Sequence, residues 1–267
     1  MRLRRIRKIG LGLAVLVLGT VAVDPACAAV EKDASINLEE ATRAKCLRVL
    51  REALRGEEFW PSMHAAEALT GAGCSDEVRR WIEPKLKTEK DDRHRCGLAR
   101  ELVRAGDRAK AAVMLDILAS DDSYGHVHAC ESLYKVNEIG DGRLLRQALA
   151  QTEDLRKSLM AAAALGRWGS PAAMAVLRRH VKDRDPESAR IAAWVLARIG
   201  HRRDIPALRA GRQRFDDPLV RAYFEHALAM LGDAEGLAAL AANLASPNPS
   251  IRTFAAVFAG EARATHL

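Results

Sequence analysis

The chain has 267 residues, of which 49% are hydrophobic and 29% charged, and its formal net charge is +7. Residues 1–29 hold five of the basic residues and a single acidic one, so the rest of the chain carries 37 basic and 34 acidic residues, a net charge of +3. This near balance argues against a nucleic-acid-binding protein, whose surface would be strongly basic.

The amino terminus predicts export. "MRLRRIRK" is a basic segment, "IGLGLAVLVLGTVAV" is apolar but short for a membrane span, and "DPACAA" ends in small residues. We expect a secretory signal over residues 1–29, cleaved after Ala28 or Ala29, and a periplasmic or secreted domain over residues 30–267 without a membrane span. A lipoprotein signal using Cys27 is the alternative, although Asp24 stands where such signals usually carry leucine.

A repeat of about 31 residues predicts an α-solenoid. "DPESARIAAWVLARIG", "DPLVRAYFEHALAMLG" and "NPSIRTFAAVFAG" each begin with Asp-Pro or Asn-Pro, contain an arginine (Arg190, Arg221 or Arg252) and end at glycine. Asp or Asn caps a helix and Pro fits its first turn. Glycines mark the reversals between helices, at Gly106, Gly140, Gly200 and Gly232.

We therefore predict an all-α fold, an α-solenoid of about six antiparallel helix pairs with an extra helix at each end. The expected entry helix spans residues 36–56 and the last helix begins near residue 249. The pairs between them are expected at residues 60–88, 91–119, 125–151, 154–182, 186–214 and 217–245.

The repeated segments resemble HEAT repeats, in particular the short bacterial form named for phycobilisome lyases. The resemblance is most specific over residues 185–260, where Asp-Pro, the arginine and the closing glycine recur. It implies an armadillo-type, right-handed superhelix in which the Asp and Arg link neighbouring repeats. Some members are chromophore lyases, but no matching site motif transfers that activity to this chain.

One motif occurs twice. Trp60, His64 and Glu67 have the same spacing as a second set that lies 64 residues later, Tyr124, His128 and Glu131. The intervening repeat aligns Arg100 with Glu67, which gives a row of Glu67, Arg100 and Glu131 that alternates in sign. We expect this row to bridge adjacent repeats as a structural ladder, with contact to a ligand as the alternative and catalysis as the least favoured reading.

In the later repeats, the positions that align with His64 and Glu67 are Met160 and Ala163, Ile191 and Trp194, and Tyr223 and His226. The charged row is thus confined to the first three pairs. Two repeats separate His64 from His128, on the order of 20 Å at 8–10 Å per helix. We therefore expect no shared metal ion and no cofactor.

Four cysteines follow the predicted signal, Cys46, Cys74, Cys96 and Cys130. An oxidising compartment favours disulfides. Cys96 and Cys130 occupy equivalent helices, too far apart to bond directly, and we expect them to be small buried residues. Cys74 is the most plausible partner for Cys46, and the pairing is left open.

The second helices of the pairs are basic, with 16 Lys or Arg against 9 Asp or Glu. We expect these helices to line the concave side of the solenoid and to attract an acidic partner. The candidate residues are Arg178, Arg179, Lys182, Arg202, Arg203, Arg209, Arg212 and Arg214.

The sequence thus predicts a monomeric scaffold without catalysis of its own, which binds another protein or an acidic macromolecule. One alternative is a lyase-like or hydrolytic enzyme that uses the two aromatic-His-Glu motifs. The other is a structural accessory module of a secreted enzyme.

Overall fold

The computed structural model describes residues 39–262 and 264, and the predicted signal at residues 1–29 lies outside them. The described region contains fourteen α-helices and no strand, which confirms the all-α prediction. All of them belong to one compact unit that begins at Leu38. None of these helices is long and apolar enough to cross a membrane.

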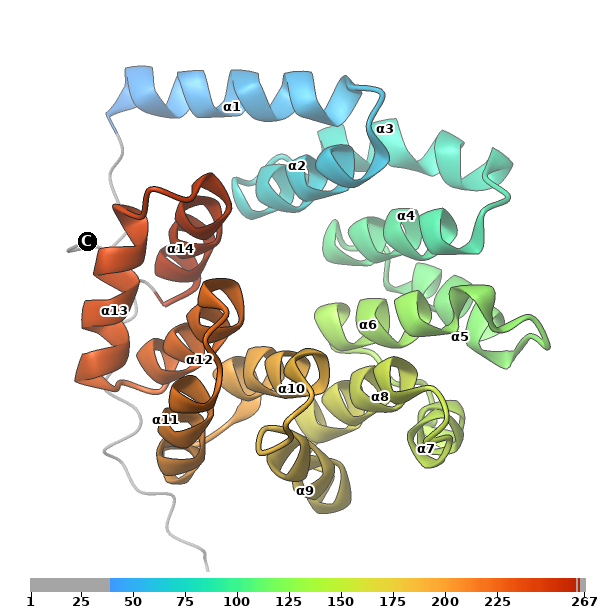
Figure 1. Ribbon diagram of the computed structural model, residues 1–267. Helices are drawn as coiled ribbons and strands as arrows, with labels where there is room; N and C mark the ends of the chain where they lie inside the picture. Colours follow the sequence, from blue (N-terminus) through green and yellow to red (C-terminus); the bar gives the residue numbers. More distant parts are fainter. Residues whose placement is uncertain (1–38, 263, 265–267) are drawn as a thin grey trace, which may run out of the picture. The chain divides into compact units, whose positions relative to one another are not determined.

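The helices alternate between two rows (Figure 1). The even-numbered row consists of α2 (Phe59–Gly71), α4 (Asp92–Arg104), α6 (His126–Val136), α8 (Leu155–Arg167), α10 (Pro186–Ile199), α12 (Pro218–Met230) and α14 (Pro249–Glu261). The odd-numbered row consists of α1 (Glu40–Arg55), α3 (Ser75–Thr88), α5 (Ala111–Ala119), α7 (Arg143–Ala150), α9 (Pro171–His180), α11 (Ile205–Arg214) and α13 (Ala234–Leu244). Short 3-10 turns stand before α5, α6 and α11, at Arg108–Lys110, Ser123–Gly125 and Arg202–Asp204.

Side chains cap the helices that open with Asp-Pro or Asn-Pro. Asp185 accepts a hydrogen bond from the amide of Ser188, and Asp217 accepts two, from Leu219 and Val220. These bonds satisfy amides that have no partner within the helix. Gly232 has a φ of 80° in the turn after α12, a conformation that favours glycine, whereas Gly200 is extended.

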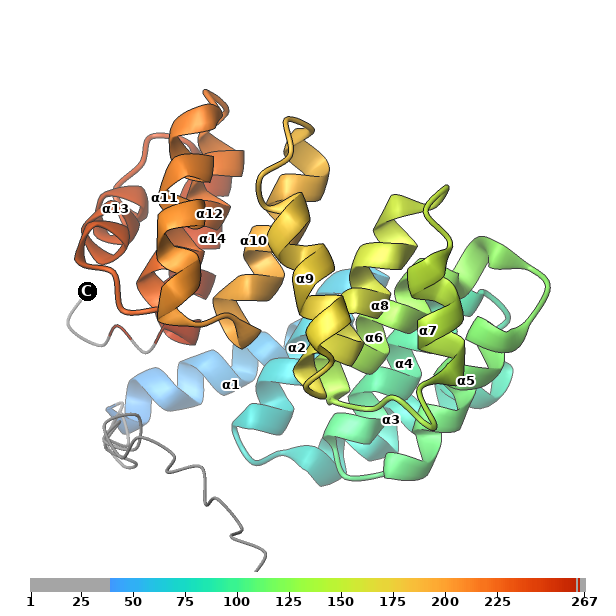
Figure 2. The same ribbon diagram turned by 90° about the horizontal axis from the view of Figure 1, so that it is seen from below.

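The two rows differ in how closely their helices pack. Each even-numbered helix packs directly on the next, whereas among the odd-numbered helices only α5 and α7 pack on each other closely. Closely stacked helices lie on the inside of a curved array and splayed helices on the outside. The even-numbered row is therefore the inner one, and Figure 2 shows α7 and α9 in front of α8, on its outer side.

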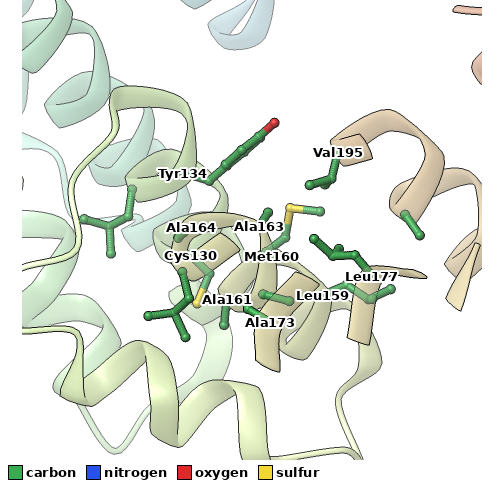
Figure 3. Close-up of a cluster of buried hydrophobic side chains, with 14 of the residues drawn as sticks. Cys130, Tyr134, Leu159, Met160, Ala161, Ala163, Ala164, Ala173, Leu177 and Val195 are labelled. Carbon is green, nitrogen blue, oxygen red and sulfur yellow. The ribbon is translucent and has the colours of Figure 1, made fainter. Parts of the chain in front are cut away.

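Small side chains allow the inner row to stack tightly. Every residue of α8 from Lys157 to Gly166 is buried, and four of them in succession, residues 161–164, are alanines. Figure 3 labels three of these alanines, Ala161, Ala163 and Ala164, beside Cys130 and Leu159. The hydroxyl of Tyr134 points away from this cluster, toward the hollow described below.

Candidate functional site

The inner row encloses a hollow, which we call the inner groove. It consists of two adjoining cavities of about 490 and 820 Å³ that share His64, Lys135, Trp194, Tyr223 and Phe254 in their walls. Every residue that lines them belongs to an even-numbered helix, and the lining reaches from α2 to α14. A combined volume of this size fits a drug-sized ligand or a short segment of extended chain.

Aromatic side chains form one wall of the inner groove. The ring of Tyr134 meets that of Trp194 edge-on with centroids 5.4 Å apart, and Tyr223 contacts Phe254 and Phe258 at 5.6 and 5.3 Å. Such rings provide apolar contact area at little cost in side-chain entropy. The buried Tyr134 hydroxyl has no hydrogen-bond partner among the described residues, and burial raises its pKa to about 12, so it remains a donor.

Each carboxylate of the inner groove has a cation beside it. Glu67 pairs with Arg104 at 2.8 Å and Glu131 with Lys135 at 2.6 Å. Arg156 pairs with Glu187, and Arg198 with Glu261. The carboxylates are therefore neutralised within the protein.

Two arginines of the groove have no carboxylate partner within the described residues. Arg190 lies over the Tyr223 ring, 5.2 Å from its centroid, and Arg167 lies 5.7 Å from the centroid of Tyr134. Arg167 also donates to the backbone carbonyl of Tyr134 at 3.0 Å. Stacking on a ring orients a guanidinium but leaves its charge in place. The groove thus carries positive charge beside apolar surface.

Buried His226 connects α12 to α14. Its side chain is 0% exposed, its ring stacks on Phe258 with centroids 4.0 Å apart, and its Nε2 lies 3.0 Å from a carboxylate oxygen of Glu261. Burial lowers the pKa of His226 more than Glu261 raises it. The imidazole is therefore neutral at neutral pH and helps to hold α14 against the groove.

Comparisons with known proteins found two similarities. Residues 142–228 match the family described as HEAT repeats. The segment from α7 into α12 therefore consists of HEAT repeats. A solved structure of human deoxyhypusine hydroxylase in complex with glycerol is similar at 16% identity and a TM-score of 0.39, over 84% of this chain and 98% of that one. A search of curated proteins found no match.

The HEAT-type Asp and Arg positions act mainly within their own repeats. Asp185, Asp217 and Asn248 cap helices, and Arg252 donates to the carbonyls of Ser246 and Pro247 in its own turn. Arg190 alone of the three arginines reaches the next repeat, through Tyr223. The implied link between neighbouring repeats is therefore found at Arg190, whereas the hydrogen bonds of Asp185, Asp217, Asn248 and Arg252 stay within their own repeats.

The two aromatic-His-Glu motifs meet, although two repeats separate them. The Trp60 ring stacks on His128 with centroids 5.3 Å apart and planes at 17°. Tyr124 lies in the 3-10 turn before α6, where its hydroxyl donates to Asp91 at 2.9 Å and its ring packs under Arg93. The motifs are therefore structural contacts at this end of the groove, and His64 and His128 both line its smaller cavity.

The predicted Glu67–Arg100–Glu131 ladder is wrong in its pairing. Arg100 is 4% exposed and donates to Glu101 at 2.6 Å, while Arg104 and Lys135 pair with the two outer glutamates. Burial of Glu67 opposes its ionisation, but His64 and Arg104 outweigh burial and lower its pKa to about 2. The Glu67–Arg104 pair therefore still bridges the adjacent helices α2 and α4, as expected of the row, whereas Glu131 pairs within α6.

The basic second helices lie on the outer side, so their predicted place on the concave face is wrong. Their splayed packing accounts for this position. Several of the arginines stabilise the array itself, because Arg178 pairs with Asp204 at 2.7 Å and Arg209 with Asp233 at 2.6 Å. Others are Arg212, 3.8 Å from Glu235, and Arg214, which donates to the Asp183 carbonyl. Arg178, Lys182 and Arg203 line a separate cavity of about 360 Å³.

The cysteines of the described region are all unpaired. Cys46 is exposed and Cys74 half-buried, and they do not bond to each other. Cys96 and Cys130 are buried, as the sequence predicted, and burial raises the pKa of each thiol to about 12. The described residues also contain no group of three or more His, Cys, Asp or Glu side chains arranged to hold a metal ion.

Sequence reasoning missed most of the inner groove, although a signal for it was present. The positions aligned with His64 are His128, Met160, Ile191 and Tyr223, and all of them line the smaller cavity. Only Gly97 breaks the series, because it packs under the Phe59 ring. The positions aligned with His64 in the later repeats, which are not charged, therefore indicate where the groove lies.

Proposed function

We propose that the protein is an exported scaffold whose inner groove binds an extended, acidic segment of another polypeptide. The observation that carries the proposal is the charge pattern of the groove. Its carboxylates are each paired, whereas Arg167 and Arg190 lie over aromatic rings without a carboxylate. An occupant that brings its own carboxylates and apolar side chains complements this surface.

Two further features support an extended occupant. The groove crosses the inner helices from α2 to α14, which matches the way helical repeat proteins bind along their concave surface. The rings of Trp194, Tyr223 and Phe254 line its wall, and they offer stacking surface to the apolar side chains of the bound segment. The basic amino-terminal segment and apolar stretch that follows it support export.

A binding assay with defined peptides tests this function. Fluorescein-labelled peptides that alternate Glu and Leu are titrated with the protein and followed by anisotropy, beside peptides that alternate Lys and Leu. We expect saturable binding of the Glu-Leu peptide only, weakening as salt rises because the attraction is screened. Arg190→Gln should weaken binding about tenfold, the loss of one charge-assisted contact.

The matched control is Arg221→Gln, which removes an equal charge from an exposed position on α12 that does not line the groove. It should leave the affinity within about twofold, since a distant exposed charge is largely screened. Equal binding of the Lys-Leu peptide, or equal losses in the two variants, would rule out recognition by the groove.

A further inference from the structure

Another cavity, of about 590 Å³, lies at the carboxyl ends of α8 and α10. Arg167, Arg178, Arg198 and Arg203 line it together with His201, and none of its lining residues is acidic. We call it the arginine pocket. Its apolar lining includes Met174 and Ile199.

The arginines converge from different elements. Arg167 and Arg198 come from the last turns of α8 and α10, Arg178 from α9 and Arg203 from the 3-10 turn before α11. A cation at the carboxyl end of a helix interacts favourably with the helix dipole, which accounts for Arg167 and Arg198. It does not account for Arg178 and Arg203, which reach the same cavity from other segments.

Internal bonds hold three of the guanidinium groups in place. Arg178 donates from Nε to Asp204 at 2.7 Å, Arg198 donates to the Trp194 carbonyl at 2.8 Å, and Arg167 donates to the Tyr134 carbonyl at 3.0 Å. Arg178 also donates to the second carboxylate oxygen of Asp204, and Arg198 donates to Glu261. Each guanidinium has five N–H donors, so these bonds still leave donors free. The side chain of Arg203 has no hydrogen bond or ion pair among the described residues and is exposed.

The carboxylates nearest to these arginines are already committed. Asp204 accepts two hydrogen bonds from Arg178 and one from the amide of His201. Burial opposes ionisation of Asp204, but these hydrogen bonds outweigh it and hold its pKa below the usual range. Glu261, the partner of Arg198, lines the inner groove and not the arginine pocket. Arg178 and Arg198 are thus neutralised by these carboxylates, whereas Arg167 and Arg203 have no carboxylate partner among the described residues, so the excess positive charge of the pocket comes from these two.

We propose that the arginine pocket is a binding site for a tetrahedral oxyanion, namely phosphate or sulfate, either free or as a monoester. A planar carboxylate is satisfied by one guanidinium in a bidentate pair. Several arginines that converge from separate segments match a group with three or four acceptor oxygens and up to two charges.

Calorimetric titration of the full protein at constant ionic strength tests the site. The probes are inorganic phosphate, sulfate and O-phosphoserine, with serine and acetate as controls. We expect saturable binding of the three oxyanions at one site and none of the controls. O-Phosphoserine binding more tightly than inorganic phosphate would assign the site to a phosphomonoester, and the reverse order would assign it to the free ion.

Two neighbouring arginines provide matched variants. Arg203→Gln removes a charge that lines the pocket, whereas Arg202→Gln removes the adjacent charge, which does not line it, and both positions are exposed. We expect at least an about tenfold loss of phosphate affinity in the first variant and less than about twofold in the second. Binding that does not saturate, or that falls equally in both variants, would overturn the proposal. Arg190→Gln should not change phosphate binding, which separates this site from the inner groove.

Discussion

His128 lies flat against Trp60, so an imidazole that the sequence suggested as a ligand or catalyst serves as a packing surface. Burial lowers its pKa, and the cations Arg93, Arg100 and Lys135 add to this effect against the opposing influence of Glu131. The ring is therefore neutral at neutral pH. Its contribution to stability is complete above the unfolded pKa of about 6.5 and declines as the pH falls through the lower folded value.

Arg100 and Glu101 form the most deeply buried ion pair near the motifs, at 4% and 0% exposure. Arg100→Ala leaves the Glu101 carboxylate buried with Arg104 as its remaining partner. We expect the free energy of unfolding, measured by urea titration, to fall by roughly 1–3 kcal/mol. Arg221→Ala, at an exposed position, should lower it by less than about 0.5 kcal/mol. Equal losses would show that Arg100 has no special structural role.

At the scale of the helices, the ends were predictable from local chemistry. The caps at Asp185, Asp217 and Asn248, each followed by proline, place the starts of α10, α12 and α14 within a residue of the prediction. These signals act within a few residues of one another. They need no knowledge of the tertiary structure, which is why the sequence alone was sufficient.

The choice of the inner row was not predictable in the same way. It depends on how closely each row of helices packs, and that is a property of contacts between repeats. The buried alanines of α8, residues 161–164, allow close stacking of the inner row, but a run of alanine does not say in which direction the array bends. The groove residues Tyr223 and Phe254 were therefore not predicted as a site, although the register of His64 pointed toward them.

Glycine at position 236 maintains the contact between α12 and α13. A Cβ atom added there would lie 2.6 Å from the backbone nitrogen of Ala229 and 2.5 Å from Cβ of Leu228, neither of which can rotate away. We expect Gly236→Ala to lower the free energy of unfolding by about 1–3 kcal/mol. The control is Gly260→Ala in α14, where a Cβ meets nothing within 4 Å. It should be neutral or stabilise by up to about 1 kcal/mol, and a stable Gly236→Ala protein would contradict this account of the interface.

For the whole molecule, the predicted export decides in which compartment the protein would bind a partner. When the full-length chain is produced in a Gram-negative host, we expect a periplasmic protein whose first residue is Ala29 or Val30, because cleavage follows small residues. Amino-terminal sequencing with mass spectrometry checks this. A lipid-modified chain that begins at Cys27 would indicate the lipoprotein alternative, and an uncleaved cytosolic chain would contradict export.

The inner groove takes its walls from α2 at one end of the array and α14 at the other. The distance across the groove therefore depends on the sum of the small rotations between all successive inner helices from α2 to α14. A substitution outside the groove, such as one at the α12–α13 contact, changes the rotation at one interface and so changes the distance between α2 and α14. A ligand that contacts both α2 and α14 fixes the distance between them. Its binding therefore restrains the helix interfaces in between, including those that it does not contact.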